Sequence, residues 1–295
     1  MSTLSCLLHF SSAFTARPRP ARTTSALPAY ESVTEPLIIM EPFTQTVVSE
    51  PLTDLVAPVS EIKLTWEPAV AEQIRKIILE KHARPEPADE FTASNEPYMV
   101  AVIGIPGSGK STSSSILTGQ LADVGCLIMP FDGYHYPIET LKTFEDPDDA
   151  IYRRGAPDTF DVKALKNDLK SMRFGDRKVV KVPGFDHAAG DPEPDAHTFD
   201  RDEHHVIITE GLYLLHDEDG WEEVKDYFDM TIFVNADVDV CVDRLKERNR
   251  CIPGYTPEEI DLRCDVVDRV NAETVNKSRA RASLVVESVG SVPLC

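Results

Sequence analysis

Long apolar runs, paired cysteine motifs and an excess of basic residues are all missing from this chain of 295 residues. No stretch reaches the roughly 18 uninterrupted apolar residues that a membrane-spanning helix needs. The six cysteines stand apart without CxxC spacing, which predicts free thiols rather than disulfides or a zinc site. The 50 acidic residues outnumber the 30 basic ones, and the resulting charge of −20 repels phosphate backbones and anionic lipids. We therefore expect neither a nucleic-acid partner nor a membrane partner.

Apolar content is sufficient for a globular core. Residues of the apolar classes make up 42% of the chain and charged residues 27%. These proportions exclude a mostly disordered, collagen-like or coiled-coil protein and favour one main domain with extensions. They do not determine the oligomeric state, so a monomer and a homo-oligomer both stay open.

The first 30 residues differ from the rest in composition. They contain no Asp or Glu, three arginines and many Ser, Thr, Ala and Pro residues, which is typical of an organelle transit segment. An apolar patch at residues 4–10 precedes Ser12, Ala13 and Phe14, and this arrangement resembles the bipartite plastid presequences of diatom-type algae. We expect a disordered targeting segment and a plastid location, with a mitochondrial or cytoplasmic location and an ordinary disordered tail as the alternatives.

The next segments lead into the core. Residues 31–64 are rich in Glu and Pro and predict an acidic linker. Residues 65–97 form a helical extension, because apolar side chains from Val70 to Ile78 recur on one face of a helix that runs from Pro68 to about Arg84. The main domain is expected at 98–288, followed by a tail at 289–295.

Within the main domain, short apolar runs alternate with helical stretches. Strands are predicted at 98–105, 126–131, 179–182, 205–209, 230–234 and 283–286, and helices at 111–121, 162–172, 238–249 and 257–276. This alternation predicts an α/β fold, a doubly wound and mostly parallel sheet with helices on both faces. Ligands of such folds bind beyond the carboxyl ends of the strands.

A glycine-rich loop follows the first of these strands. Residues 104–111 fit GxxxxGK[ST] between a buried strand and a helix, which is the context of a P-loop that binds ATP or GTP. Backbone N–H groups of such a loop approach phosphate oxygens, Lys110 reaches the β- and γ-phosphates, and Ser111 offers its hydroxyl to Mg²⁺. A plain Gly-rich turn is the alternative. The predicted nucleotide-binding residues are Gly104, Pro106, Gly107, Ser108, Gly109, Lys110, Ser111 and Thr112.

A carboxylate at the end of another strand is suited to binding a metal ion. Glu210 follows the apolar residues 206–209 and precedes a glycine, so it is predicted to hold Mg²⁺ together with Ser111. An ordinary exposed acid at a strand end is the alternative. The NKxD signature of guanine specificity is absent, since residues 276–279 depart at the last position. This favours ATP over GTP.

Asp132 is the candidate catalytic base. It ends the second predicted strand, where the sheet would direct it into the same crevice as the P-loop. Here the sequence resembles the phosphoribulokinase, uridine kinase and pantothenate kinase group of P-loop kinases. The resemblance implies that Asp132 acts as general base toward a substrate hydroxyl and that Tyr134 and His135 line the acceptor pocket. A turn-forming Asp-Gly pair is the alternative.

Three further segments, at residues 153–161, 183–187 and 210–215, strengthen the resemblance. Residues 153–161 resemble the R-x-G-A-P-x-T-F-D stretch of a poorly characterised branch of nucleoside and sugar kinase-like proteins, in which Arg153 or Arg154 could bind an acidic group by its planar fork. A surface ion-pair role is the alternative. Asp186 and His187 stand in a segment that resembles the one carrying a substrate-contacting His in pantothenate kinase relatives. Asp268, Asn271 and Ala272 resemble a substrate-side D-x-x-N-A segment of the same branch, to which no contact is assigned.

A helical lid is expected after the fifth strand. Arg244 and Arg248 on the helix at 238–249 are spaced so that guanidinium groups can approach the transferring phosphate. Kinases of the group carry lid arginines at this place, and a solvated helix face is the alternative.

The combined prediction is a kinase that uses ATP and Mg²⁺ to phosphorylate a hydroxyl of a small metabolite such as a sugar, a nucleoside or a pantothenate-like compound. Lys110, Asp132 and the two lid arginines are its predicted catalytic residues. Two alternatives remain open. One is a nucleotide-dependent ATPase switch or scaffold without a small-molecule acceptor. The other is a nucleotide kinase with a phosphate acceptor, which requires Arg153 or Arg154 for acceptor binding.

Overall fold

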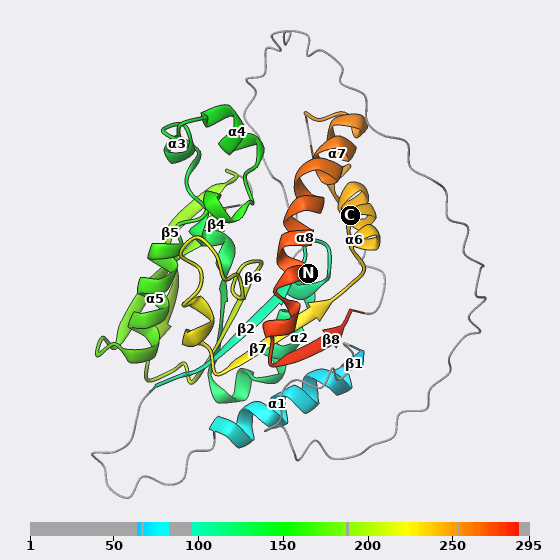
Figure 1. Ribbon diagram of the computed structural model, residues 1–295. Coiled ribbons are helices and arrows are strands. Elements are labelled where there is room, and N and C mark those ends of the chain that lie inside the picture. Colours follow the sequence, from blue (N-terminus) through cyan, green and yellow to red (C-terminus); the bar gives the residue numbers. More distant parts are fainter. Residues whose placement is uncertain (1–63, 66–67, 83–95, 187–188, 253, 289–295) are drawn as a thin grey trace, which may run out of the picture. The chain divides into compact units, whose positions relative to one another are not determined.

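The structure is a computed structural model that describes residues 64–65, 68–82, 96–186, 189–252 and 254–288 (Figure 1). The predicted transit segment at 1–30, nearly all of the linker and the tail at 289–295 lie outside the described residues. The domain boundaries around them therefore stay predictions. None of the helices in the described part is long and apolar enough to cross a membrane.

A parallel sheet of six strands forms the centre of the described unit. Its strands, in spatial order, are β1 (Leu64–Thr65), β8 (Leu284–Glu287), β7 (Met230–Asn235), β2 (Tyr98–Gly104), β6 (Val206–Gly211) and β3 (Cys126–Pro130). Every residue of β2 is buried, as expected for an apolar strand covered on both faces. The predicted mostly parallel sheet is confirmed.

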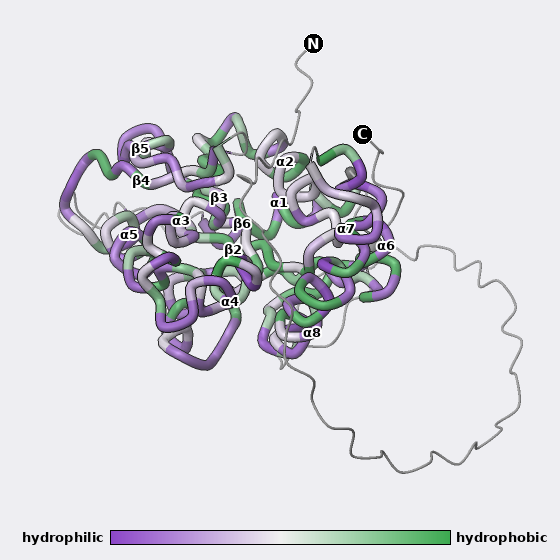
Figure 2. Tube along the Cα trace, turned by 90° about the horizontal axis from the view of Figure 1, so that it is seen from above, coloured by the Kyte–Doolittle hydropathy of each residue, from purple (hydrophilic) through white to green (hydrophobic). Residues whose placement is uncertain are grey.

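Helices cover both faces of this sheet (Figure 1). One face packs against α1 (Pro68–His82) and α2 (Lys110–Gln120), with Val100 and Val102 of β2 among the buried strand residues. The other face packs against α5 (Val162–Phe174), α6 (Val238–Asn249) and α8 (Arg269–Lys277), with Ala101 and Ile103 of β2 on that side. Seen from above, apolar segments are visible at the central strands β2 and β6 (Figure 2). The doubly wound arrangement is confirmed.

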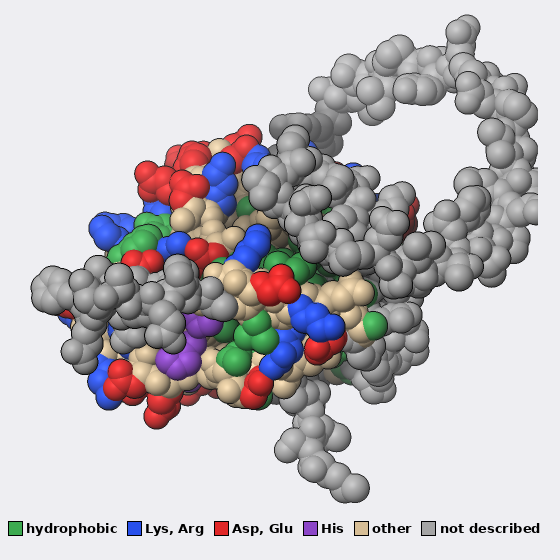
Figure 3. All heavy atoms as spheres, turned by 90° about the horizontal axis from the view of Figure 1, so that it is seen from below, with side chains coloured by type: hydrophobic (Ala, Val, Ile, Leu, Met, Phe, Trp, Pro, Cys, Tyr) green, Lys and Arg blue, Asp and Glu red, His purple; other side chains and the backbone are tan. Residues whose placement is uncertain are grey.

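The extension before the main domain is part of the core. On α1, Ile74 and Ile78 are 1% and 0% exposed and join the cluster on the first face of the sheet. Arg75 on the same helix donates to the Gln120 carbonyl at 2.7 Å. On the side of the sheet where α1 lies, acidic and basic side chains are intermingled at the surface (Figure 3). Helix α1 thus covers one apolar face that the sheet would otherwise expose.

The strand predicted at 179–182 lies outside the central sheet, and this correction has a clear cause. It belongs to β4 (Val179–Asp186), which pairs antiparallel with β5 (Asp191–Asp200) as a separate hairpin. Burial alternates along β4, with Val180 and Val182 buried and Lys181 exposed. Such alternation is typical of a strand with one solvated face.

Other elements follow the predictions closely or were too short to predict. The helix expected at 257–276 is α7 (Pro257–Arg263), a π-helical turn (Cys264–Asp268) and α8. Asp161 caps α5, its carboxylate accepting from the Ala164 amide at 2.8 Å, as expected. The short helices α3 (Ile138–Leu141) and α4 (Pro147–Tyr152) were not predicted. Single 3₁₀ turns lie at Ala122–Val124, Phe131–Tyr134, Pro157–Thr159, Val224–Tyr227 and Arg279–Arg281.

Candidate nucleotide and acceptor site

The glycine-rich loop connects β2 with α2 in a conformation that needs its glycines. Gly107 and Gly109 have φ values of 81° and 85°, a region that other residues rarely adopt. A Cβ atom at position 107 would also lie 2.7 Å from the Cys241 carbonyl oxygen at the start of α6. The loop is closed by a hydrogen bond from the Ser108 amide to the Ile105 carbonyl at 3.1 Å. Its shape is therefore fixed by local sequence and by the approach of α6.

Helix α2 begins at Lys110, directly after this loop, and no side chain caps its first turn. The unpaired amides and the positive end of the helix dipole therefore face the loop, as in sites that bind phosphate groups. Ser288, after β8, donates from its hydroxyl to the Ser108 carbonyl at 2.6 Å. This bond supports the loop from the end of β8, which is separated from β2 by β7 in the sheet. Of the predicted loop residues, Ser111 and Thr112 are exposed on the first turn of α2.

Lys110, Ser111 and Glu210 meet at the carboxyl end of the sheet. Because β2 and β6 are neighbours, with Val102 opposite Glu210, the end of β6 lies beside the glycine-rich loop. Lys110 Nζ is 3.5 Å from Glu210 Oε1, and the Ser111 hydroxyl donates to the same oxygen at 3.1 Å. Magnesium in nucleotide sites is held by one or two protein oxygens together with phosphates and waters. The hydroxyl and the carboxylate fit such an ion.

Burial acts strongly on Glu210. It raises the pKa of the carboxyl, and the negative charge of Asp132 acts in the same direction, whereas Lys110 lowers it. The electrostatic effect of Asp132 reflects the sheet, because β3 lies beside β6 with Pro130 opposite Glu210. The structure thus brings the predicted base, the predicted metal ligand and the P-loop lysine to one edge of the sheet.

His135 lies next to the candidate base. Its Nδ1 is 2.8 Å from the Asp132 carbonyl oxygen, which can only accept, so Nδ1 carries the proton. The ring is 4.0 Å from that of Phe160 and 5.2 Å from that of Phe185, measured between centroids. Burial lowers the pKa of His135, which favours the neutral ring with an accepting Nε2.

Tyr134 has a different position from the predicted one. The residue is 2% exposed, and its hydroxyl donates to Asp168 Oδ2 on α5 at 2.9 Å. Its side chain belongs to the core cluster between the sheet and α5. The prediction that Tyr134 lines an acceptor pocket is therefore corrected: the Asp-Gly turn points this side chain inward.

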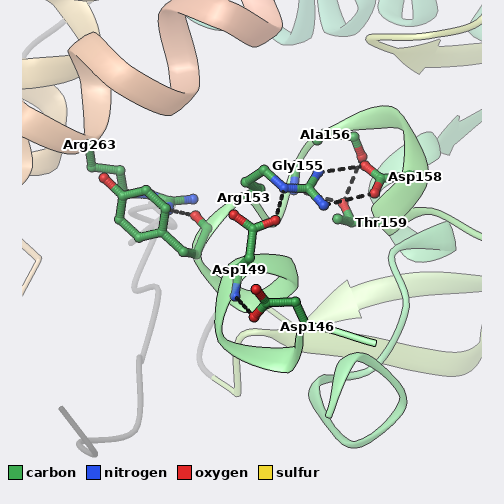
Figure 4. A network of polar contacts seen from close by, with 9 residues as sticks. Asp146, Asp149, Arg153, Gly155, Ala156, Asp158, Thr159 and Arg263 are labelled. Carbon is green, nitrogen blue, oxygen red and sulfur yellow. Dashed lines mark hydrogen bonds and ion pairs between the residues drawn. The ribbon is translucent and has the colours of Figure 1, made fainter. Parts of the chain in front are cut away.

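The two neighbouring arginines are both engaged by the protein itself. Arg153 is paired with Asp149 and, through both terminal nitrogens, with Asp158 at 2.8 and 3.0 Å (Figure 4). Arg154 is 8% exposed and donates to the Gly190 and Tyr136 carbonyls and to Asp191. The structure therefore supports the ion-pair alternative for Arg153 and gives Arg154 a structural role at the tip of the hairpin.

Asp186, another predicted substrate residue, lies at the same hairpin. Asp186, the last residue of β4, is exposed, and its Oδ1 accepts from the Ala189 amide at 3.2 Å, as in a turn. His187 lies outside the described residues. A substrate contact by either residue stays a prediction.

The lid arginines occupy successive turns of α6. Arg244 donates from Nη1 to the Gly107 carbonyl at 3.4 Å, so it lies against the P-loop. Arg248, one turn later, lines a cavity that also contains Pro106 of the loop. The helix is positioned by the contact of its first turn with Gly107. The structure thus brings both predicted arginines to the side of the P-loop.

The sequence did not single out two further residues of this cavity, Tyr255 and Arg263. Arg263 on α7 donates to the Tyr152 and Arg154 carbonyls at 2.6 and 3.1 Å, and Figure 4 shows it reaching toward the loop that follows α4. No local motif marks Arg263, because its partners are more than 100 residues away in the chain. Three other lining residues do belong to sequence motifs: Pro106 to the P-loop, Arg248 to the predicted lid helix and Asp268 to the D-x-x-N-A segment.

A parallel sheet with a P-loop at the carboxyl end of its central strand and an acidic residue on the adjacent strand defines a P-loop nucleotide-binding fold of the α/β class. The chain belongs to the phosphoribulokinase / uridine kinase family, whose model matches residues 99–294. The predicted resemblance to this group is thereby confirmed.

Several proteins are similar to this chain. A Schizosaccharomyces pombe protein, provisionally named a uridine kinase, is 29% identical over 208 residues, 68% of this chain and 88% of that protein. An ATP-dependent kinase-like protein from Aspergillus versicolor is 35% identical over 153 residues, 50% of this chain and 88% of that protein. A crystal structure from Silicibacter sp. TM1040, provisionally described as a fructose transport system kinase, has a TM-score of 0.61 at 27% identity and covers 74% of this chain and 97% of its own.

Proposed function

We propose that this protein uses ATP and Mg²⁺ to transfer the γ-phosphoryl group to a hydroxyl of a small metabolite. The observation that carries the proposal is the convergence of Lys110, Glu210 and Asp132 at the carboxyl end of three adjacent strands. A nucleotide-binding site alone needs no second acidic group there. A carboxylate near the phosphate end of the site suits general-base catalysis toward an acceptor hydroxyl.

Each residue then has a specific task. Lys110 and the loop amides bind the phosphates, and Ser111 and Glu210 would hold the ion, which when bound neutralises charge on the phosphate oxygens. Asp132 accepts the proton of the acceptor hydroxyl, and neutral His135 lies next to it. Arg244 stabilises charge on the transferring group from the lid side.

One observation from the structure and one from the relatives help to choose between a phosphate acceptor and a hydroxyl acceptor. The phosphate-acceptor alternative depends on Arg153 or Arg154, and both guanidinium groups are bound by carboxylates or carbonyls of the protein. Relatives named as a uridine kinase and as a fructose transport system kinase act, by those names, on compounds with free hydroxyls. Both observations favour a hydroxyl acceptor such as a sugar, a nucleoside or a pantothenate-like compound.

The test is ATP consumption by the full chain, with Mg²⁺, against a panel of nucleosides, sugars, sugar phosphates, pantothenate and glycerate. We expect stimulation by one acceptor class, and Asp132→Asn should lower kcat for that acceptor by about 10²- to 10⁴-fold. Asp176→Asn, at an exposed position beyond α5, is the matched control and should behave as the wild type. ATP hydrolysis that no compound stimulates and that Asp132→Asn leaves unchanged would contradict the proposal in favour of a nucleotide switch.

A further inference from the structure

Basic residues are concentrated on helix α5 and in the turn that follows it. Residues 162–181 contain seven of the 30 Lys and Arg residues and only two of the 50 Asp and Glu residues. This segment therefore has a charge of +5, although the whole chain has a charge of −20. A local reversal of sign gives this part of the surface a different electrostatic field from the rest of the molecule.

One face of α5 is open to solvent. Lys163, Asn167, Lys170 and Phe174 are exposed, and their spacing places them on the same side of the helix. Phe174 is 56% exposed, which is unusual for a large apolar side chain. Neither lysine forms an ion pair with another described residue. The exposed face of α5 thus presents positive charge that the described part of the chain leaves unpaired, with an apolar side chain at its end.

An acidic segment lies along the same helix (Figure 1). Residues 217–229 contain seven Asp and Glu residues and a single lysine. Near the start of α5, Lys166 Nζ is 3.4 Å from Glu223 Oε2, and near its end Arg173 Nη2 is 2.7 Å from Asp229 Oδ1. The acidic segment and the helix therefore run side by side in the same direction.

This segment has exposed carboxylates besides the two that pair with α5. Four of them form no ion pair with another described residue, and they belong to Glu218, Asp219, Glu222 and Asp226. We call these four residues the acidic row, and we call Lys163 and Lys170 the basic row. At the border between the segment and α5, the ring centroids of Phe174 and Tyr227 are 6.5 Å apart. The surface thus combines two rows of opposite charge with aromatic side chains at their border.

The two rows restrict what can bind to this surface. A partner of one sign would be attracted by one row and repelled by the other. A second copy of this chain carries both rows in the same order. When a two-fold axis runs parallel to the rows along their border, each basic row lies opposite the acidic row of the other copy. Phe174, which lies at the border, then meets its own counterpart.

We propose that this surface joins two copies of the chain into a symmetric dimer, held by the opposed basic and acidic rows and by burial of Phe174. A two-fold contact uses the same surface of both copies, so assembly stops at two. The net charge of each copy opposes association at long range, but physiological salt screens exposed charges that are more than about 8 Å apart. The rows face each other at closer range. This inference is independent of the proposed kinase function.

Sedimentation velocity of the full chain at about 0.15 M NaCl, near physiological ionic strength, tests the proposal. We expect the wild type to be a dimer in reversible exchange with the monomer. The double variant Lys163→Glu, Lys170→Glu places acidic groups opposite acidic groups and should raise the dissociation constant at least about tenfold. The double variant Glu222→Lys, Asp226→Lys places basic groups opposite basic groups and should have the same effect.

A mixture of these two double variants gives the sharpest measurement. One variant then carries acidic side chains in both rows and the other carries basic side chains in both, so each row meets the opposite charge. We expect the mixture to form a one-to-one heterodimer although each variant alone is mainly monomeric. This recovery would also show that both variants are folded.

The matched control is the double variant Lys76→Glu, Lys81→Glu. It changes the net charge as much as the first variant does, at exposed positions of α1, and should dimerise like the wild type.

Four results would overturn the inference. They are a wild type that stays monomeric at its highest soluble concentration, a dimer that both double variants leave intact, and double variants that do not associate when mixed. The fourth is a mass that keeps growing beyond two copies as the concentration rises, because this would show a head-to-tail contact between different surfaces.

Discussion

At the scale of single residues, Glu210 is expected to lower the stability of the fold while it supports the binding of ADP with Mg²⁺. Burial raises its pKa despite the nearby Lys110, so the folded protein binds a proton more tightly than the unfolded chain does. An acid with a raised pKa in the folded state costs stability once pH rises above the ordinary pKa of a glutamate, about 4.3. In the absence of nucleotide, Glu210→Gln should therefore be more stable than the wild type at neutral pH.

Thermal unfolding without nucleotide or Mg²⁺ checks this expectation. At pH 7.5 we expect Glu210→Gln to raise Tm by about 2–4 °C, the shift that about 1 kcal/mol produces in a domain of this size. The gain should shrink as the pH falls through about 4.3, because the glutamate then becomes protonated in both states. Affinity for ADP with Mg²⁺ should fall in the same variant. Glu223→Gln, at an exposed position, is the control, and a lower Tm for Glu210→Gln at pH 7.5 would contradict the argument.

At the scale of elements, two adjacent arginines provide a matched comparison. Arg154 ties the hairpin tip at Gly190 and Asp191 to the segment before α3, and it is almost fully buried. Breaking a buried charge network costs about 3 kcal/mol or more, whereas an exposed pair like those of Arg153 contributes at most about 1 kcal/mol. Arg154→Gln should therefore destabilise the protein much more than Arg153→Gln in urea unfolding. Equal effects of the two substitutions would show that the hairpin is anchored elsewhere.

The elements that could be predicted from the sequence are those whose signal is local. The buried run of β2 and the loop motif after it predict both the strand and the phosphate site, because glycine conformations and backbone amides are properties of a few consecutive residues. The prediction that β4 belongs to the central sheet was wrong. Its burial alternates from residue to residue, but within the four residues 179–182 this pattern resembles the short apolar run of a buried strand. Arg263 and the inward side chain of Tyr134 depend on contacts made across the fold, which no short pattern contains.

At the scale of the whole described unit, α1 determines whether one face of the sheet is covered. Its buried Ile78 joins a cluster that includes residues of β2, β6, β7 and β8. Loss of this packing should therefore destabilise the entire sheet. Ile78→Ala should lower the free energy of unfolding by about 2–5 kcal/mol. Lys76→Ala, exposed on the same helix, should change it by less than about 0.5 kcal/mol.

The measurement that separates an integral helix from a loosely docked one uses two probes in a Trp66→Phe background, where Trp221 is the remaining tryptophan. Trp221 is buried in the cluster on the other face of the sheet from α1. If α1 is an integral part of the fold, urea unfolding followed by far-UV circular dichroism and by Trp221 fluorescence gives coincident curves, and Ile78→Ala shifts both together. A shift of the dichroism curve alone would mean that α1 detaches while the sheet keeps its structure, which the burial of Val100 and Val102 beneath this cluster argues against.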